Sequence, residues 1–390
     1  MNRTSGMLER LHASQPEDRA YHSLPPALWN ASQNRATKDM IKQYVESRDN
    51  MSLLHFDTDK PMDFIAVGRL CIDLNANEIN RPMEETMTFT KYVGGSPANI
   101  TIGMARLGMK TGFIGRVADD QMGRFIRHYL EQNGIDTSSV ITDEPGSVTG
   151  LAFTEIKSPT DCSILMYRDN VADLNLSPQD VSENYIKQAK VLLISGTALA
   201  ASPSREAVFL AVEYARKHGV VVVFDLDYRP YTWQSVEETA TYYNLAAEKC
   251  DVIFGTREEF DMMEQFEADR SHDDQATANK WFDYHAKIVV IKHGKDGSIA
   301  YTKDGQSYTG TTFPAKVIKT FGAGDAYASA FIYGLMRGWD IPKCMEFGSA
   351  SAAIVISSHS CSDAMPTADA ITDYMEKCRN GEMASNGHIN

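Results

Sequence analysis

The chain has 390 residues, of which 43% are hydrophobic, so it can bury a large core; one domain of about 300 residues with accessory segments fits this length. The formal net charge of −14 argues against a general binder of nucleic acid or of anionic membranes, because both carry negative charge. No stretch approaches the roughly 20 apolar residues of a membrane span, and the N-terminus lacks the apolar segment of a secretory signal. We therefore expect a cytoplasmic protein whose partners are small molecules.

The six cysteines show no pattern of a disulfide framework or of a metal finger, because they are scattered and form no C-x-x-C pair. We expect them to be reduced and mostly packed in the interior. The segment His359-Ser360-Cys361 contains two types of metal ligand, but no second ligand pair lies near it in the sequence. The sequence therefore predicts no metal ion bound directly by the protein.

Three regions differ in composition. Residues 1–60 are polar with mixed charge, and a short helix near residues 38–48 is the regular element that we expect there. This segment has three interpretations: a flexible leader, an arm that docks a partner, or an extension upstream of a core that starts at Met51. Its acidic residues argue against a mitochondrial address. Residues 61–378 form the expected main domain, and residues 379–390 an expected flexible tail.

From residue 63 onward, strand-like apolar runs alternate with helical patterns. The run Val220-Val221-Val222-Val223-Phe224 is apolar on both of its faces, which is typical of a buried parallel strand covered by helices. The pattern predicts an α/β fold with a doubly wound, mainly parallel sheet flanked by helices. Two β-rich stretches, residues 86–93 and 151–167, break the alternation because no helix separates their strands. The expected strands and helices are 64–70, 97–107, 111–117, 122–133, 191–194, 205–218, 220–225 and 252–254.

Near its C-terminal end the chain reads Thr320-Phe321-Gly322-Ala323-Gly324-Asp325, followed by a run of small residues with helical character. Two glycines allow a tight turn, so the free amide groups of the first helical turn would point into it. Such a turn can bind an anion, and Asp325 at its edge can accept a proton from a hydroxyl group. Turns of this composition that merely cap a helix are common, so the motif alone does not decide the function.

A second glycine pair, Gly94-Gly95, precedes Ser96-Pro97-Ala98-Asn99. With Pro97 at the first helical position and Ser96 as its cap, a helix is predicted to begin here, and it would end at Gly108. This segment combines a backbone that a ligand can approach closely, a polar Asn99 side chain and a helix N-terminus.

The paired motifs Gly94-Gly95-x-x-x-Asn99 and Gly322-Ala323-Gly324-Asp325 resemble the signatures of the ribokinase or PfkB family of carbohydrate kinases. The resemblance covers about residues 63–370, and it implies a ribokinase-like fold that binds a sugar, ATP and Mg²⁺. It also implies that segments near residues 75–95 and 150–170 form a small β-sheet lid over the sugar. In the family such lids often pair between subunits, so we expect a homodimer.

Four further stretches resemble, within the family, the 5-dehydro-2-deoxygluconokinases of inositol catabolism. They are Gly68-Arg69-Leu70-Cys71-Ile72-Asp73-Leu74-Asn75, Arg81-Pro82-Met83-Glu84-Glu85-Thr86, Leu165-Met166-Tyr167-Arg168 and Asp225-Leu226-Asp227-Tyr228-Arg229-Pro230-Tyr231-Thr232-Trp233. The resemblance implies phosphorylation of the C6 hydroxyl of 5-dehydro-2-deoxygluconate, with Asp325 as the base. The alternatives are a 2-keto-3-deoxygluconate kinase, a fructokinase, a nucleoside kinase of the adenosine type, and a non-catalytic sugar-binding regulator.

On the sugar side, the resemblance assigns ligand contacts to Asp73, Gly94, Gly95 and Asn99. These residues are expected beyond the carboxyl ends of strands, where a doubly wound sheet binds its ligands. The alternative for Asp73 is a buried cap or ion pair, and the alternative for Asn99 is an amide that faces water.

Arg168 and Arg229 match arginines that contact the acid group in the 2-keto-3-deoxygluconate kinases of the family. The planar fork of a guanidinium group matches a carboxylate, so two arginines at the sugar pocket favour an acidic sugar over a neutral one. The alternative for Arg229 is a local ion pair with Asp225 or Asp227.

On the nucleotide side, Gly255-Thr256-Arg257-Glu258 stands at the place of the family's N-x-x-E motif, with glycine in place of the asparagine. Lys292-His293-Gly294-x-x-Gly297 resembles the segment beside ATP, and His293 itself is expected to be structural. Residues implied to contact the nucleotide or the water shell of Mg²⁺ are Glu258, Lys292, Gly294 and Gly297.

Lys319 stands where many members of the family carry an aspartate that helps to hold a monovalent cation near the anion site. An ammonium group repels such an ion and can substitute for its charge. We therefore expect activity to need Mg²⁺ but little or no K⁺.

Overall fold

The computed structural model describes residues 53–159, 161–267 and 272–382. By its internal contacts the chain divides into two units, Met1–His55 and Phe56–Asn390, and the fold described below is that of the second. The helix expected near residues 38–48 lies outside the described residues. Within the described part, no helix has the length and apolar character needed to cross a membrane.

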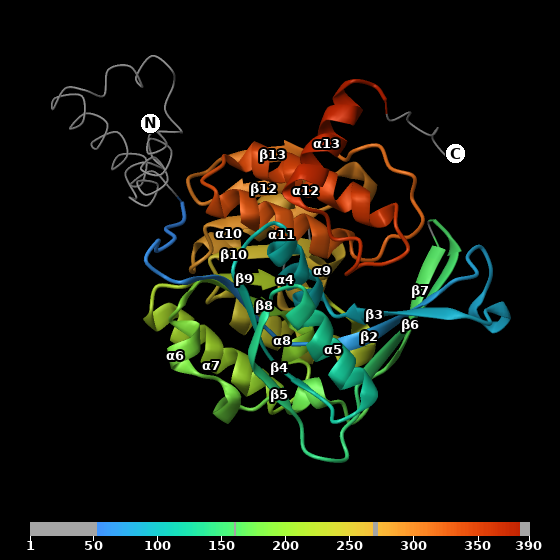
Figure 1. The fold of residues 1–390 in the computed structure, drawn as a ribbon. Helices are drawn as coiled ribbons and strands as arrows, with labels where there is room; N and C mark the ends of the chain where they lie inside the picture. The colour runs from blue at the N-terminus through green and yellow to red at the C-terminus, as the bar shows by residue number, and fades with distance from the viewer. Residues whose placement is uncertain (1–52, 160, 268–271, 383–390) are drawn as a thin grey trace, which may run out of the picture. The chain divides into compact units, whose positions relative to one another are not determined.

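A nine-stranded sheet forms the centre of this unit, in the order β13-β12-β11-β10-β9-β8-β1-β4-β5 (Figure 1). Strands β12 and β13 run antiparallel at one edge, and the strands from β11 to β5 are all parallel. The α/β, mainly parallel fold predicted from the sequence is therefore confirmed. The strands are β1 (Met62–Val67), β4 (Thr111–Val117), β5 (Asp136–Thr142), β8 (Ala189–Ser195), β9 (Val221–Asp225), β10 (Val252–Thr256), β11 (Ile288–Lys292), β12 (Ser298–Thr302) and β13 (Ser307–Gly310).

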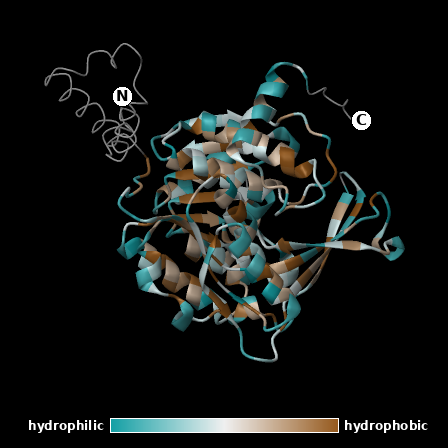
Figure 2. Cartoon of the chain, in the orientation of Figure 1, coloured by the Kyte–Doolittle hydropathy of each residue, from teal (hydrophilic) through white to brown (hydrophobic). Residues whose placement is uncertain are grey.

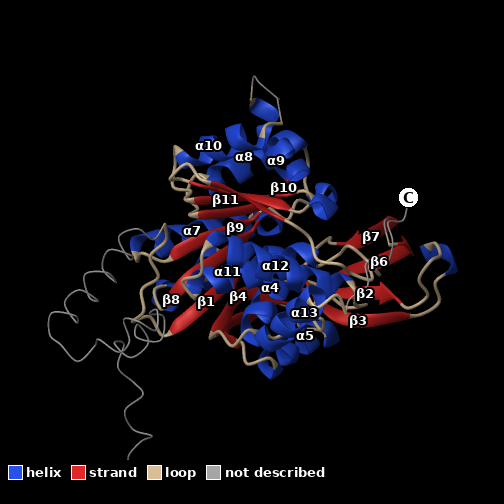
Figure 3. Ribbon diagram, turned by 90° about the horizontal axis from the view of Figure 1, so that it is seen from above, coloured by secondary structure: helices blue, strands red, loops and turns tan. Residues whose placement is uncertain are grey.

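Helices cover both faces of this sheet, as Figure 3 shows for α8, α9 and α10 on one side and α4, α11 and α12 on the other. Figure 2 shows hydrophobic residues concentrated along the strands and hydrophilic residues on the helices and loops around them. The helices are α4 (Ser96–Arg106), α5 (Gln121–Gln132), α6 (Glu183–Ile186), α7 (Ser204–Lys217), α8 (Val236–Ala247), α9 (Arg257–Met263), α10 (Asp274–Phe282), α11 (Ala323–Met336), α12 (Ile341–Ile356) and α13 (Ala368–Arg379).

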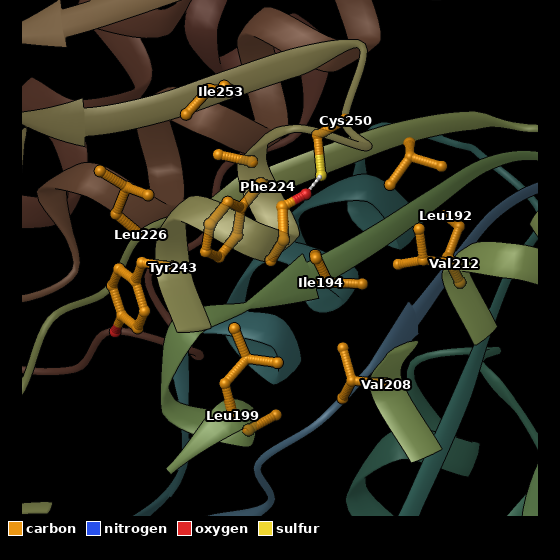
Figure 4. Packing of buried hydrophobic residues seen from close by; sticks show 14 of the residues in the cluster. Leu192, Ile194, Leu199, Val208, Val212, Phe224, Leu226, Tyr243, Cys250 and Ile253 are labelled. Carbon is orange, nitrogen blue, oxygen red and sulfur yellow. Dashed lines mark hydrogen bonds between the residues drawn. The ribbon is translucent and has the colours of Figure 1, made fainter. Parts of the chain in front are cut away.

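The larger core lies between the sheet and the helices α7, α8 and α10. In Figure 4, Ile194 of β8 and Phe224 of β9 lie on the face covered by Val208 and Val212 of α7. Each of these side chains is fully buried, which stabilises the fold by about 1.5–3 kcal/mol per side chain. Successive side chains of a strand point to opposite faces of the sheet, and Phe254 of β10 points to the other face. There it packs edge-on against a ring of α11.

A second, four-stranded sheet has the order β3-β2-β6-β7 and extends from one edge of the unit (Figure 1). Its strands are β2 (Cys71–Ala76), β3 (Phe89–Gly94), β6 (Gly150–Ser158) and β7 (Asp161–Tyr167). The two β-rich stretches that break the alternation in the sequence supply β3, β6 and β7. We call this second sheet the lid sheet.

The sequence pattern did not separate β2 from the strand before it. The expected strand 64–70 ends at Val67, because Gly68 has a φ of 142° and redirects the chain into the lid sheet. The side chain of a larger residue would also be crowded at this position, since a Cβ atom on Gly68 would lie 3.2 Å from the Cβ of Ala198. Asp73 consequently lies in the middle of a lid strand.

Candidate active site

A cavity of about 210 Å³ lies between the lid sheet and the carboxyl ends of the parallel strands. Asp73 of β2 and Met166 of β7 line it from the lid. From the large sheet, Asp225, Thr256 and Lys292 line it, and these residues end β9, β10 and β11. The cavity is thus at the place where a doubly wound sheet binds its ligands.

The two glycine motifs meet in this cavity. Gly95 and Asn99 line it together with Gly322, Gly324 and Asp325. The amide Nδ2 of Asn99 donates a hydrogen bond of 2.8 Å to the carboxylate Oδ2 of Asp325, although the two residues are 226 positions apart in the sequence. The structure therefore brings together residues that the sequence analysis assigned to the sugar and to the transferred phosphate.

The C-terminal motif forms the N-terminus of α11. Gly322 is the N-cap, with a left-handed φ of 79°, and no side chain caps the helix; Ala323 is its first residue. A Cβ atom on Gly322 would lie 2.8 Å from the Sγ of Cys361, so glycine is needed for space as well as for conformation. The ammonium group of Lys292 lies 3.1 Å from the position of a Cβ on Gly324. Free amides and an ammonium group together make a site for an anion.

Asp325 is the acidic residue in the first turn of α11, at this site. Burial raises the pKa of Asp325 above its ordinary value, and the negative charge of Asp227 adds to the rise. The hydrogen bond from Asn99 opposes it. A carboxylate with a raised pKa is a stronger base than a carboxylate in water, which suits proton abstraction from a hydroxyl group.

The first glycine pair makes room for its neighbours. A Cβ atom on Gly94 would lie 2.0 Å from the Oδ1 of Asp73, and a Cβ atom on Gly95 would lie 2.6 Å from the carbonyl oxygen of Arg69. Gly95 has a φ of 104°, which L side chains rarely adopt. The pair therefore lets β3 approach Asp73 closely. Burial raises the pKa of Asp73 to about 6, and the charge of Arg69 opposes this rise.

The prediction that Ser96 caps the helix is wrong by one residue. Helix α4 begins at Ser96, and its N-cap is Gly95. No side chain caps the helix, so the amides of its first turn stay free. The hydroxyl of Ser96 instead donates a hydrogen bond to Asp225 Oδ2, across the cavity floor. Pro97 is consequently the second residue of the helix, one position later than expected.

The two predicted arginines lie in different environments. Arg229 lines the cavity, where its Nη2 contacts Asp227 Oδ1 at 2.7 Å, so the ion pair considered as its alternative role is present. Arg168 does not line the cavity. Its Nη2 is held by Asp173 Oδ2 at 2.6 Å and by the carbonyl oxygen of Thr197 at 3.1 Å. Arg69, which the sequence analysis did not single out, lines the cavity in its place.

Comparison with known proteins agrees with this geometry. The model of the pfkB family carbohydrate kinases matches residues 63–368. The chain belongs to this family. Two relatives named 5-dehydro-2-deoxygluconokinase, from Geobacillus thermodenitrificans and Bacillus cereus, are 81% and 72% identical over 326 residues. Each alignment covers 84% of this chain, and 96% and 98% of the respective relative.

Solved structures show the same fold. A PfkB protein from Polaromonas sp. JS666 superposes with a TM-score of 0.68 at 27% identity, covering 77% of this chain and 98% of that one. A fructokinase from Xylella fastidiosa with bound ATP has a TM-score of 0.72 at 22% identity, covering 80% and 98% of the two chains. At 22% identity, the likeness to the fructokinase shows a shared fold and nothing about activity.

The residues that we expected at the place of the family's N-x-x-E motif, Gly255 and Glu258, do not line the cavity, but their neighbours do. Thr256 and Glu259 line the cavity and form a capping box at the start of α9, whereas Glu258 is exposed and lies outside the cavity. Gly255 is buried in β10, where a Cβ atom would lie 2.5 Å from Leu226 Cδ1, so no asparagine fits there. Glu259 is fixed by two backbone amides, those of Tyr228 and Thr256.

The other residues expected beside the nucleotide are divided. Lys292 lines the cavity, and its ammonium group lies 3.8 Å from Asp225 Oδ1. Gly294 and Gly297, both with positive φ, form the turn between β11 and β12 and do not line the cavity. His293 pairs with a carboxylate of α10 at 2.7 Å, which is a structural contact, as expected.

Lys319 is fully buried beside the anion site. Its Nζ donates a hydrogen bond of 2.7 Å to the carbonyl oxygen of Phe321 and lies 3.5 Å from the Sγ of Cys361. The ammonium group thus interacts with the backbone just before the N-cap of α11. In this chain the positive charge beside the N-cap of α11 is therefore that of a lysine side chain.

Proposed function

We propose that this chain is an ATP-dependent sugar-acid kinase that phosphorylates the C6 hydroxyl of 5-dehydro-2-deoxy-D-gluconate. The names of relatives that are 72–81% identical support the substrate. The observation that carries the reaction type is the hydrogen bond between Asn99 and Asp325, because it places the sugar side and the phosphate side of the cavity in contact.

In the proposed mechanism, Asp325 takes the proton from the C6 hydroxyl as this oxygen attacks the γ-phosphorus of ATP. The amides at the start of α11 and the ammonium group of Lys292 stabilise the charge on the transferred phosphoryl group. Asn99 orients the base through its hydrogen bond. Positioning and charge stabilisation account for most of the catalysis of phosphoryl transfer, so the lid sheet contributes by excluding water.

The cavity carries oxygen ligands suited to the hydrated Mg²⁺ of a nucleotide complex. The carboxylate of Glu259 is fixed by two backbone amides and retains free lone pairs, and the Asp225 carboxylate lies beside Lys292. When bound, Mg²⁺ supplies charge neutralisation of the triphosphate. Among the described residues, one other group has metal-ligand geometry, Asp261 with Glu264 and His272, but Arg257 already pairs with both of its carboxylates.

A substrate panel tests the function. ADP release is measured with 5-dehydro-2-deoxygluconate, 2-keto-3-deoxygluconate, fructose and adenosine, each with the parent and with the Asp325→Asn variant as the control for contaminating kinases. We expect the highest kcat/KM with the first compound, and no Asp325-dependent release with adenosine. A higher kcat/KM for either of the other sugars would reassign the chain to a 2-keto-3-deoxygluconate kinase or a fructokinase. Binding without any ADP release would indicate a regulator.

We also propose that the kinase works without K⁺, because the Lys319 ammonium group already interacts with the Phe321 carbonyl oxygen. Activity should depend on Mg²⁺ and should be equal within about twofold in Tris, Na⁺ and K⁺ salts of the same ionic strength, since screening is then constant. Steady-state rates in the three salts check this. A large, saturable rise with K⁺ alone would contradict the proposal.

For its partners, we propose a cytoplasmic homodimer formed through the lid sheet. The described cysteines are all free thiols, which fits a reducing compartment. On the face of the lid sheet that points away from the cavity, Leu165 is 47% exposed and Tyr167 is 59% exposed. These residues lie beside the aromatic pair Phe89 and Phe153, so the sheet carries an apolar surface that a second copy can cover.

A further inference from the structure

Arg69 is a buried cation of the cavity with few partners. It is 5% exposed, yet within the described ranges its Nη1 contacts only the sulfur of Met166, at 3.5 Å, and its Nη2 lies 3.6 Å from Asp227 Oδ2. Among the described residues, no group accepts a hydrogen bond from its Nε. A thioether is a weak acceptor, so most of the five N–H donors of this guanidinium group have no good acceptor within the described part of the chain.

Arg116 shows what a fully paired arginine looks like in the same chain. Its Nη1 donates to Asp143 at 2.5 Å, and its Nε and Nη2 form a fork on Asp180 at 2.8 and 3.0 Å. This arginine lies outside the cavity lining and has a structural role. Among the residues that the structure describes, Arg168 also has two donors without a partner, Nε and Nη1, but it does not line the cavity. Arg69 has both free donors and a place in the lining, which indicates that these donors serve a ligand.

The Asp227 carboxylate beside Arg69 is committed to other groups. Asp227 accepts hydrogen bonds from Ser195 and Thr197 on Oδ2, and its Oδ1 binds Arg229 at 2.7 Å. Asp227 therefore makes only a long contact with Arg69, 3.6 Å between its Oδ2 and the Nη2 of Arg69. Behind Arg69, the buried Arg168 pairs with Asp173, and burial lowers the pKa of Arg168 while the positive charge of Arg69 lowers it further.

Two guanidinium groups, those of Arg69 and Arg229, therefore line this corner of the cavity beside the carboxylate of Asp227, and the ion pair of Arg168 with Asp173 lies outside the lining. Buried donors without acceptors are costly, and a ligand carboxylate would accept hydrogen bonds from the free donors of Arg69. Asp73 also lies near Arg69 but is the residue expected to bind a sugar hydroxyl.

We propose that Arg69 is the residue that selects an acidic sugar, by binding the C1 carboxylate together with Arg229. Arg168 is a positioning residue whose charge, held by Asp173, keeps Arg69 directed toward the cavity. This inference rests on the proposed function and assigns the acid-reading role to a residue other than the pair expected from the sequence.

The test compares the sugar acid with its C1 carboxamide, which has the same shape and no charge. The parent should prefer the acid by about 100-fold in kcat/KM, the scale of a lost charged hydrogen-bond pair. Arg69→Gln should remove this preference by lowering the value for the acid about 100-fold, while the value for the carboxamide changes less than about threefold. Arg69→Lys, which keeps the charge and loses the fork, should retain part of the preference.

Arg116→Gln is the matched control, because it removes an ion-paired arginine outside the cavity and should leave the preference unchanged. Thermal unfolding of each variant reports whether it folds. If Arg69→Gln lowers kcat/KM for both substrates equally, or if Arg69→Gln keeps the preference while Arg168→Gln abolishes it, the inference is overturned. A parent enzyme that releases no ADP with the acid but turns over fructose overturns the proposed function itself, which is a separate and recognisable result.

Discussion

At the scale of single residues, the site is a set of charges whose burial changes their acid–base behaviour. Asp73, Asp225 and Asp325 all have raised pKa values because burial disfavours their charged forms. Burial raises the pKa of Asp225 to about 7, and the nearby Lys292 opposes the rise. Perturbed carboxylates that share a cavity with arginines and lysines are typical of a catalytic site.

The base is tested by Asp325→Asn. An amide cannot accept the proton of the attacking hydroxyl, so kcat should fall by about 10² to 10⁴, the usual contribution of a general base. The affinity for ATP should stay within about threefold, because the anion site is made by backbone amides and Lys292. Turnover by ADP release and nucleotide binding by calorimetry measure the two effects. Asp283→Asn, at an exposed position, is the control; near-normal turnover of the Asp325 variant would refute the assignment.

The pKa of Asp73 predicts a pH dependence. A carboxylate with a pKa of about 6 is ionised at pH 7.5 and protonated at pH 5, so kcat/KM for the sugar should fall below about pH 6 as Asp73 loses its charge. Rate profiles between pH 5 and 8 at saturating ATP check this. A profile that is flat down to pH 5 would show that the ionised form is not required.

The same pKa makes Asp73 a source of instability at neutral pH. Its folded-state pKa of about 6 exceeds the ordinary 3.8, so the folded state binds the proton more tightly and stability is lost as pH rises between these values. A rise of about two pKa units corresponds to about 3 kcal/mol. Asp73→Asn should therefore gain up to about that free energy of unfolding at pH 8 and little at pH 4, as denaturant titrations would show. An equal effect at both pH values would contradict the pKa.

At the scale of elements, short segments rather than whole helices connect the parts of the site. The segment after α12 contacts the lid sheet through His359, whose Nε2 lies 2.7 Å from the carbonyl oxygen of Ala76 and whose Nδ1 lies 3.1 Å from the hydroxyl of Tyr92. Its backbone oxygen also accepts a hydrogen bond from Asn75. Two residues later, Cys361 packs beside the N-cap of α11. The segment thus joins the lid sheet to the anion site.

His359→Ala should loosen the lid sheet over the sugar. The loss of two ring contacts, worth about 1 kcal/mol each, should raise KM for the sugar by about tenfold or more and change KM for ATP much less. Steady-state kinetics with each substrate varied check the difference. His359→Gln, which keeps one donor, should recover part of the loss, and His128→Ala on the exposed face of α5 should have no effect. An unchanged KM for the sugar would rule out this role.

Elements with strong periodicity were predicted well from the sequence, and elements defined by their neighbours were not. The expected strand 111–117 coincides with β4, and the expected helix 205–218 differs from α7 by one residue at each end. The lid strand β2 was missed, because its residues continue an apolar run from β1 and only the φ of Gly68 separates them. The sequence likewise pointed to Glu258 where Glu259 lines the cavity. It matched Gly255 to an asparagine, but packing against Leu226 leaves no room for a side chain at that position.

At the scale of the whole molecule, the exposed apolar face of the lid sheet bears on assembly. Leu165→Asp places a charge at the centre of the surface that we propose to be covered by a second copy, so it should weaken the dimer by at least about tenfold. Light scattering over a range of protein concentrations measures this. Leu245→Asp, at an exposed leucine of α8, is the control and should not alter the mass. A parent protein that is monomeric at all concentrations would contradict the lid-mediated dimer.

The sequence by itself determined the fold class and the two glycine motifs, because these depend on local periodicity and on backbone conformations that few residues adopt. Only the tertiary structure decided which arginines face the cavity. The sequence favoured Arg168 and did not single out Arg69, but Arg69 lines the cavity, whereas the guanidinium group of Arg168 is held outside the lining by Asp173 at 2.6 Å. Partners of this kind are set by three-dimensional packing, which the order of residues along a strand does not show.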